Sequence, residues 1–374
     1  METLNMKFSL AVLLSLFSAI APGLQKPASA ADGGGISSAQ TNISRTTNAE
    51  FRSQFLQLCD STLVRLRHEK DGHPFFVDSY GVRSLCVAYD MTGNQKYLEA
   101  CRSWADRMVR SQKKMIPAGA YYINYGRKPG QKSGDWYVAD CSSIAMGVLS
   151  TAIRCKGAER NRLLHSVEEF ASLVIKNFVR PSGGVTDGFW PQYDGAWWCS
   201  SSLFGSFSFM LYKNTGKERY LNVALGIVDW LNKQDLATAQ PLPLSHQGPS
   251  LPMYVLECYS AGWPYLSKDN ARNKAATAQI DWSLNWAENQ QRIPIAKRHW
   301  PLLSWWGAKY GGLPFQEYIY SRYLPGHRNL LAKGDREMKL LAPVVLSGKP
   351  GVSQLTAFIL MSYAQRLDPG AIYR

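Results

Sequence analysis

The sequence predicts an all-helical single domain in which six helical hairpins close into a ring, an (α/α)6 toroid. Apolar residues recur at helical spacing along most of the chain. Units of helix, short turn, helix and long loop repeat with a period of about 55–60 residues. Few segments show the strict alternation of a β-strand, so a large sheet is not expected. These three observations favour stacked helix pairs over a sheet-based fold.

The clearest hairpin begins at Tyr80, where an apolar face with helical spacing starts. The segment 90–94 interrupts this pattern, and its Gly93 suits the left-handed conformation that ends many helices. The helical pattern resumes at Tyr97 and continues to Met108. The sequence therefore predicts two helices joined by a short turn.

Four further hairpins follow the same plan. Their helices are expected at about 140–149 and 163–174, 199–214 and 220–230, 252–266 and 270–290, and 313–323 and 328–346.

Lone helices are predicted at 51–68 and 354–367, and we expect them to pair as the sixth hairpin. Each amphipathic hairpin needs neighbours on both sides to bury its apolar stripe, and closing a ring supplies them even at the two ends. An open tetratricopeptide-like solenoid is the alternative, but the period and the loops between hairpins are too long for it.

The domain organisation begins with an export signal. Residues 1–30 combine a positive start, an apolar run at 8–16 and an Ala-Ser-Ala cleavage site at 28–30, and an uncleaved anchor is the alternative. Residues 31–48 lack apolar periodicity and are expected to form a flexible leader. Residues 49–374 then form the toroid domain. We expect a secreted or periplasmic protein with no stable membrane insertion after removal of the signal.

The formal net charge of +14 favours an acidic partner. The basic residues are scattered, with no run longer than a pair such as Lys113-Lys114, which argues against nucleic acid. We therefore expect an acidic oligo- or polysaccharide, although positive charge also serves solubility alone. The sequence leaves the oligomeric state open.

The seven cysteines are an odd number and form no C-x-x-C motif. No metal ligand spacing, phosphate loop, nucleophile elbow or dinucleotide fingerprint is present, so neither a metal nor a cofactor is expected. Most cysteines lie in apolar helical stretches and should behave as small buried hydrophobes. Cys86 and Cys101 lie on successive predicted helices and could approach each other, but spacing alone does not establish a disulfide.

Two turn segments carry a resemblance to known proteins. Residues 92–98 and 215–221 both have the form T-G-x-x-x-Y-L between predicted helices. The chain thereby resembles six-hairpin glycosidase-like (α/α)6-toroid carbohydrate-active proteins, unsaturated uronyl hydrolases first and polysaccharide lyases second. The resemblance implies a glycoside hydrolase acting on acidic, uronic-acid-containing oligo- or polysaccharide. A toroid-type lyase and a non-catalytic glycan-binding protein are the alternatives.

Asp78 and Asp140 are the candidate catalytic residues. By the resemblance, acidic residues where the inner helices begin would protonate a sugar double bond before water adds to it. A carboxyl group in an aromatic-walled cleft loses hydration, and the rise in its pKa suits a proton donor. Asp140 also stands where an N-cap is expected, so helix capping is the alternative role.

Loops that lead into the inner helices gather at one face of such a ring, and their polar and aromatic residues are the candidate substrate contacts. Aromatic rings stack on sugars and carboxylates accept hydrogen bonds from hydroxyl groups, whereas the alternative is a rim loop plugged by its own aromatics. Arg298 and His299 would meet a sugar carboxylate. The full set is His73, Asp135, Trp136, Asp187, Trp190, Tyr193, Asp194, Trp197, Trp198, His246, Arg298, His299, Trp305 and Trp306.

The lyase alternative has its own candidates, because residues 118–122 and 140–149 faintly resemble pectate lyases. A lyase places positive charge at the substrate carboxylate and uses a base. The residues that would do so are Arg127 and Lys128, with Tyr121, Tyr122 and Tyr125 as further candidates, although buried tyrosines are usually structural.

Overall fold

The computed structural model describes residues 48–66, 74–124, 136–188, 195–234, 251–291, 315, 317–319, 321, 328–347 and 354–374. It separates residues 1–47 from the unit Asn48–Arg374, to which all described residues belong. The predicted signal at 1–30 lies outside the described residues, as does the predicted leader except for its last residue. In the described residues no helix is long and apolar enough to cross a lipid bilayer.

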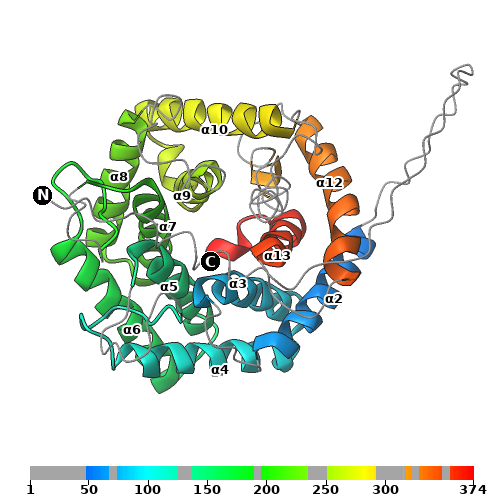
Figure 1. The fold of residues 1–374 in the computed structure, drawn as a ribbon, viewed down its shortest axis with the longest axis horizontal. Coiled ribbons are helices and arrows are strands. Elements are labelled where there is room, and N and C mark those ends of the chain that lie inside the picture. Colours follow the sequence, from blue (N-terminus) through cyan, green and yellow to red (C-terminus); the bar gives the residue numbers. More distant parts are fainter. Residues whose placement is uncertain are drawn as a thin grey trace, which may run out of the picture. The chain divides into compact units, whose positions relative to one another are not determined.

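Helices arranged in two concentric layers make up this unit (Figure 1). The inner layer contains α3 (Phe75–Thr92), α5 (Val138–Ala152), α7 (Trp198–Thr215), α9 (Leu251–Leu266) and α13 (Gln354–Leu367). The outer layer contains α2 (Asn48–Leu66), α4 (Gln95–Gln112), α6 (Gly157–Asn177), α8 (Glu218–Lys233), α10 (Asn270–Gln291) and α12 (Arg328–Ser347). Helices α13, α3, α5, α7 and α9 pack side by side in that order.

Six helical pairs are present among the described residues, which confirms the predicted (α/α)6 toroid. Five pairs are α3 with α4, α5 with α6, α7 with α8, α9 with α10, and α2 with α13. The sixth joins α12 to the helical residues 317–319, where the Tyr318 hydroxyl donates to Asp335 at 3.0 Å. Each hairpin buries its apolar stripe between its neighbours, as the repeat requires.

Helices from the two ends of the unit close the ring. The rings of Phe51 on α2 and Tyr363 on α13 meet edge to face at 5.7 Å. The Tyr363 hydroxyl also donates to Oε1 of Gln54 at 2.6 Å. The predicted pairing of the first and last helices is therefore confirmed.

Two glycines end inner helices as predicted. Gly93 and Gly216 both have φ of 67°, in the left-handed region where a side chain would be strained. Their N–H groups donate to the carbonyl oxygens of Tyr89 and Tyr212, each at 2.7 Å. This backbone cap lets the chain turn back tightly into the outer helix.

The inner helices are buried on nearly all sides, so their packing surfaces approach closely. Ser84 and Ser142 donate their hydroxyl groups to carbonyl oxygens one helical turn earlier, which satisfies them without a cross-helix partner. A Cβ atom at Gly147 would lie 2.9 Å from Oγ of Ser79 and 3.0 Å from the ring of Trp104. Glycine at this position therefore sets how closely α5 approaches α3 and α4.

Two inner helices begin earlier than predicted. Helix α3 begins at Phe75 instead of Tyr80, and α5 begins at Val138, so the expectation that Asp140 is an N-cap is wrong. The reason is that backbone groups from distant loops satisfy the first N–H groups. Phe75 donates to the carbonyl of Ile123 at 3.2 Å, and Val138 donates to that of Asp187 at 2.8 Å.

Candidate functional site

The N-terminal ends of the inner helices face one end of the ring, which we call the mouth. Inner and outer helices alternate along the chain and pack against each other, so the inner helices share one direction. Residues in the first turns of different inner helices therefore become neighbours, although they are far apart in sequence.

Asp78 and Asp140 lie in the first turns of the adjacent helices α3 and α5. The Ser79 hydroxyl donates to the carbonyl of Ser143, and the Ser143 hydroxyl donates to the carbonyl of Phe76 at 3.2 Å. These bonds join α3 and α5 at the level of the two aspartates. Asp78 is 4% exposed, whereas Asp140 is half-buried. The two predicted catalytic residues thus come from turns that pack side by side.

The segment 185–188 brings a third carboxylate to the mouth. Asp187 accepts a bond from Val138 at the start of α5, and Val185 accepts one from Trp197 just before α7, both at 2.8 Å. The Val185 N–H also donates to Oγ of Ser201 at 2.9 Å. Because its main chain is tied to both helices, this segment places Asp187, which is 7% exposed, between them.

The thiol of Cys199 marks the point where carboxylates converge. Burial raises the pKa of this thiol, and the negative charges of Asp140, Glu257 and Asp187 raise it further. These residues come from α5, α9 and the segment 185–188, while Cys199 lies in the first turn of α7. The charges of three separate elements are therefore close enough to act on one atom.

Below this point, Arg83 and Glu257 form a buried ion pair. Nη1 of Arg83 lies 2.6 Å from Oε1 of Glu257, and both side chains are 0% exposed. Helices α3 and α9 are not neighbours in the inner layer, because α5 and α7 lie between them. The pair therefore spans the interior, roughly 9–12 Å below the helix starts given the rise per residue. We call Arg83 and Glu257 the floor pair.

Aromatic and backbone groups hold the Arg83 guanidinium in place. It lies 5.8 Å from the ring centroid of Tyr80 and 5.4 Å from that of Tyr373. Its Nε donates to the carbonyl of Ile372 at 3.3 Å. Burial is the largest influence and opposes the charge, but the Glu257 carboxylate together with Tyr373 and Tyr80 raises the pKa of Arg83 overall, so the ion pair is maintained.

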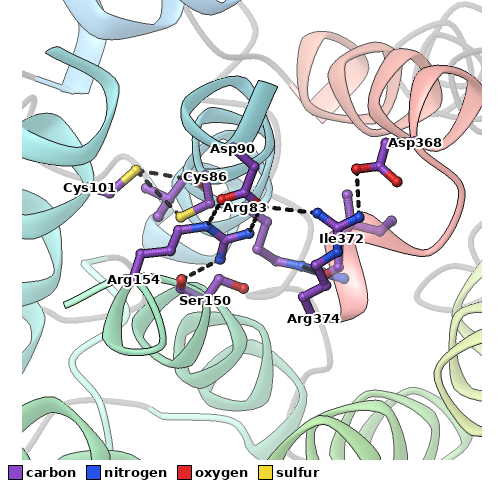
Figure 2. A network of polar contacts seen from close by, with 10 residues as sticks. Arg83, Cys86, Asp90, Cys101, Ser150, Arg154, Asp368, Ile372 and Arg374 are labelled. Atoms are coloured by element: carbon purple, nitrogen blue, oxygen red, sulfur yellow. Dashed lines mark hydrogen bonds and ion pairs between the residues drawn. The ribbon is translucent and has the colours of Figure 1, made fainter. Parts of the chain in front are cut away.

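Figure 2 shows the C-terminal residues Ile372 and Arg374 beside Arg83, within a network of polar contacts. The short helix η2 (Ala371–Tyr373) follows α13 and is buried. Arg374 contacts Asp368 at 2.6 Å and Asp90, in the last turn of α3, at 3.2 Å. Asp90 also pairs with Arg154 beyond the end of α5 at 2.5 Å. This network ties the C-terminal segment to the C-terminal ends of α3 and α5, away from the mouth.

Three polar atoms of the floor have unused hydrogen-bonding capacity. The Tyr80 hydroxyl, Nη2 of Arg83 and Oε2 of Glu257 are buried and lack a hydrogen-bond partner among the described residues. Burial, and then the Glu257 charge, raises the pKa of Tyr80, so its hydroxyl stays a donor. Buried polar groups are nearly always hydrogen-bonded, so these atoms are suited to bind a ligand hydroxyl or water.

The described tryptophans of the predicted site differ in exposure. Trp136 is 3% exposed, and its ring centroid lies 5.2 Å from that of Phe178. Trp198 is 8% exposed and packs on Trp230 at 5.4 Å. Both indoles therefore pack against neighbouring hairpin residues, whereas Trp197 is half-buried.

The remaining predicted site residues lie outside the described residues. They are His73, Asp135, Trp190, Tyr193, Asp194, His246, Arg298, His299, Trp305 and Trp306, together with the lyase candidates Tyr125, Arg127 and Lys128.

Glu257, which the structure brings to the site, is not among the residues predicted from the sequence. Its signal was one carboxylate inside an otherwise apolar helical stretch, where a charge is costly unless it is paired. Tyr121 is buried and its hydroxyl lies 2.8 Å from Oγ of Ser166, which gives it a packing role. Within the described ranges no group of three or more His, Cys, Asp or Glu side chains is placed to hold a metal ion.

No protein-family model matches the chain, and no curated protein matches it. Several solved structures, however, have a similar fold. An unsaturated glucuronyl hydrolase specific for heparin is 11% identical, with a TM-score of 0.58 over 86% of this chain and 97% of its own. A family 76 glycoside hydrolase from a bovine Bacteroides thetaiotaomicron strain is 13% identical, with a TM-score of 0.55 over 84% and 76%.

A family 76 mannosidase, Bt3792 from Bacteroides thetaiotaomicron VPI-5482, is 12% identical, with a TM-score of 0.53 over 84% of this chain and 97% of its own. Similarity at this level of identity reports on architecture. The chain therefore has the (α/α)6-toroid fold of these structures.

Proposed function

We propose that the protein is an exported glycoside hydrolase that acts at the mouth on an acidic, uronic-acid-containing oligo- or polysaccharide. The observation that carries the proposal is the placement of Asp78 and Asp140 in the adjoining first turns of α3 and α5, with Asp187 tied to the start of α5 through Val138. Carboxyl groups in different environments are what acid–base cleavage of a sugar bond requires. Export is proposed from the signal-like features of residues 1–30.

Asp140 and Asp78 are assigned the proton chemistry. In a hydration reaction, the acid gives its proton to one carbon of the unsaturated sugar while water bonds to the other carbon. The carboxylate that gave its proton takes the proton released by that water, so its acid form is regenerated. The hydrated sugar is a hemiketal, whose ring opens to a ketone and a hemiacetal, and the hemiacetal releases the next sugar as an alcohol. Asp140 is half-buried at the mouth and can meet the substrate, while Asp78 and Asp187 lie next to it on α3 and in the segment 185–188.

Two findings support an acidic substrate. The chain carries a formal net charge of +14, and one structural neighbour is a glucuronyl hydrolase specific for heparin. The family 76 neighbours, one of them a mannosidase, favour a second candidate function, which is hydrolysis of a mannan.

A single assay panel separates these functions. Unsaturated uronyl disaccharides lose the ultraviolet absorbance of their double bond when a hydrolase hydrates them, whereas a lyase acting on a uronate polymer creates that absorbance. Mannan hydrolysis neither removes nor creates this ultraviolet absorbance, but it releases reducing ends. Our proposal predicts loss of absorbance with wild type and at least about a hundredfold slower loss with Asp140→Asn.

The panel also defines what would contradict the proposal. Binding of uronyl oligosaccharides without turnover would instead indicate a glycan-binding protein. Unchanged turnover in Asp140→Asn would remove Asp140 from the mechanism. Fractionation of the native host, with the protein found in the cytoplasm, would contradict export.

A further inference from the structure

A concave pocket lies on the outer layer, at the end of α4 and in the turn that follows. Its volume is about 420 Å³, and it is lined by Arg107, Arg110, Ser111, Lys113 and Lys114. This volume is within the range of small-molecule binding sites. Arg107 and Arg110 are three residues apart on α4, so their side chains lie on one face of the helix, and Lys113 and Lys114 follow in the turn.

The pocket is basic throughout, because four of its lining residues are cationic and none is acidic. Arg110, Lys113 and Lys114 are exposed, and in the described part of the chain no carboxylate lies at ion-pair distance from them. The first part of α4 is different. There Arg102 pairs with Glu159 at 2.7 Å, and Asp106 pairs with an arginine of α6.

Contacts place this pocket at the mouth end of the ring. Helix α4 runs back along α3, so its last turn is level with the start of α3. The guanidinium of Arg107 lies 5.3 Å from the ring centroid of Phe75, the first residue of α3. Asp78 follows three residues later. A polymer that enters the mouth beside Asp78 therefore passes close to four positive charges.

Helix capping accounts for only part of this cluster. Cations near a helix C-terminus are favoured by the helix dipole, which explains Lys113 and Lys114. The helix dipole does not explain why these residues line a concave pocket. It also does not explain Arg107, which lies more than a turn before the end of α4 and packs on the ring of Phe75 at the start of α3.

We propose that this pocket, which we call the α4 pocket, binds a carboxylate-bearing sugar of the polymer at a distance from the cleaved bond. Arg107 and Arg110 have the planar fork that matches a carboxylate, and the two lysines add compact charge. The inference rests on the proposed function, because it assigns the α4 pocket to the same substrate.

The test compares two variants with equal loss of charge. The first is the triple variant Arg110→Gln, Lys113→Gln, Lys114→Gln, which keeps the partly buried Arg107. The control is Lys268→Gln, Lys274→Gln, Arg336→Gln, three exposed cations on α10, α12 and the turn before α10. Both are measured with polygalacturonate as the probe, in the wild-type and Asp140→Asn backgrounds, with thermal unfolding to check the fold.

We expect the pocket variant to weaken polygalacturonate binding about tenfold and the control less than about twofold. Unchanged binding in the pocket variant, or equal weakening in both variants, would overturn the proposal. Neutral mannan bound with the same dependence on the α4 pocket would also overturn it, as would single-stranded DNA that competes better than polygalacturonate.

Failure of the proposed function gives a different result. In that case pocket-dependent binding persists while no substrate is turned over. The opposite result is turnover that is lost in Asp140→Asn but is unchanged in the pocket variant at every polymer length. This result would support the hydrolase and refute binding at the α4 pocket.

Discussion

Arg83 and Glu257 face each other across the interior at 2.6 Å, although 174 positions separate them in the chain. Neither side chain is exposed, so each charge depends on the other for solvation. The floor pair therefore links two helices that do not otherwise pack as neighbours.

Removing one member of the floor pair should strongly destabilise the protein. We expect Glu257→Gln to lower the free energy of unfolding by about 3–5 kcal/mol, because it leaves a buried guanidinium without its counter-charge. Urea denaturation measures this. The double variant Arg83→Met, Glu257→Met should recover much of the loss, and a cost below about 1 kcal/mol for Glu257→Gln would contradict the assignment.

Cys199 should report on the site without any substrate. Neutralising a neighbouring carboxylate lowers the pKa of the thiol, so Asp140→Asn and Asp187→Asn should speed alkylation of Cys199 at a fixed pH near 8. The rate is followed by mass spectrometry of the labelled peptide. Glu99→Gln, an exposed residue on α4, is the control and should have no effect. Equal rates in all variants would show that the carboxylates do not converge on Cys199.

Stability should fall as the pH rises, because of Glu317. Burial, and then the neighbouring Glu337, raises the pKa of Glu317 from 4.5 to about 9, although Lys333 at 2.9 Å opposes the shift. Above about pH 4.5 the unfolded state has released this proton while the folded state keeps it. The free energy of unfolding therefore decreases between about pH 4.5 and 9.

Glu317→Gln should remove this component of the slope. Urea unfolding of wild type and variant across that range measures it, with Glu99→Gln as the matched exposed control. A wild-type slope that the variant retains in full would assign the pH dependence to other groups.

Glycine at position 147 should be required for packing. The Cβ atom of Gly147→Ala would meet Ser79 and the buried Trp104 at about 3 Å, and overpacking of this kind costs about 1–3 kcal/mol. That exceeds the gain of up to about 1 kcal/mol in helix propensity. Gly226→Ala on α8 is the control, because a Cβ there has nothing within 4 Å and should stabilise. Thermal unfolding of both variants compares the two effects, and a stabilised Gly147→Ala would disprove the close approach.

Local features of the fold could be predicted from sequence because local chemistry determines them. The helix Gln354–Leu367 has the predicted bounds, and Gly93 and Gly216 end helices as their conformational freedom indicates. The pairing of the first and last helices could also be predicted, because each of these amphipathic helices needs a neighbour to bury its apolar stripe.

The site was harder to predict because its contacts are long-range. Helix capping was the alternative role for Asp140, and it was wrong because the Asp187 carbonyl that satisfies Val138 at the start of α5 lies far along the chain. Glu257 was missed because its partner Arg83 is on another hairpin, and no spacing in the sequence connects the two.

The hydrogen bonds that hold the segment 185–188 have a consequence for how this part of the mouth can change in evolution. Its bonds to Val138 and Trp197 use main-chain atoms, which every residue type supplies. An exchange of Asp187 for another residue would therefore change the chemical group at this point of the mouth while leaving the main-chain tether intact. Evolution can alter this position without rebuilding the surrounding architecture.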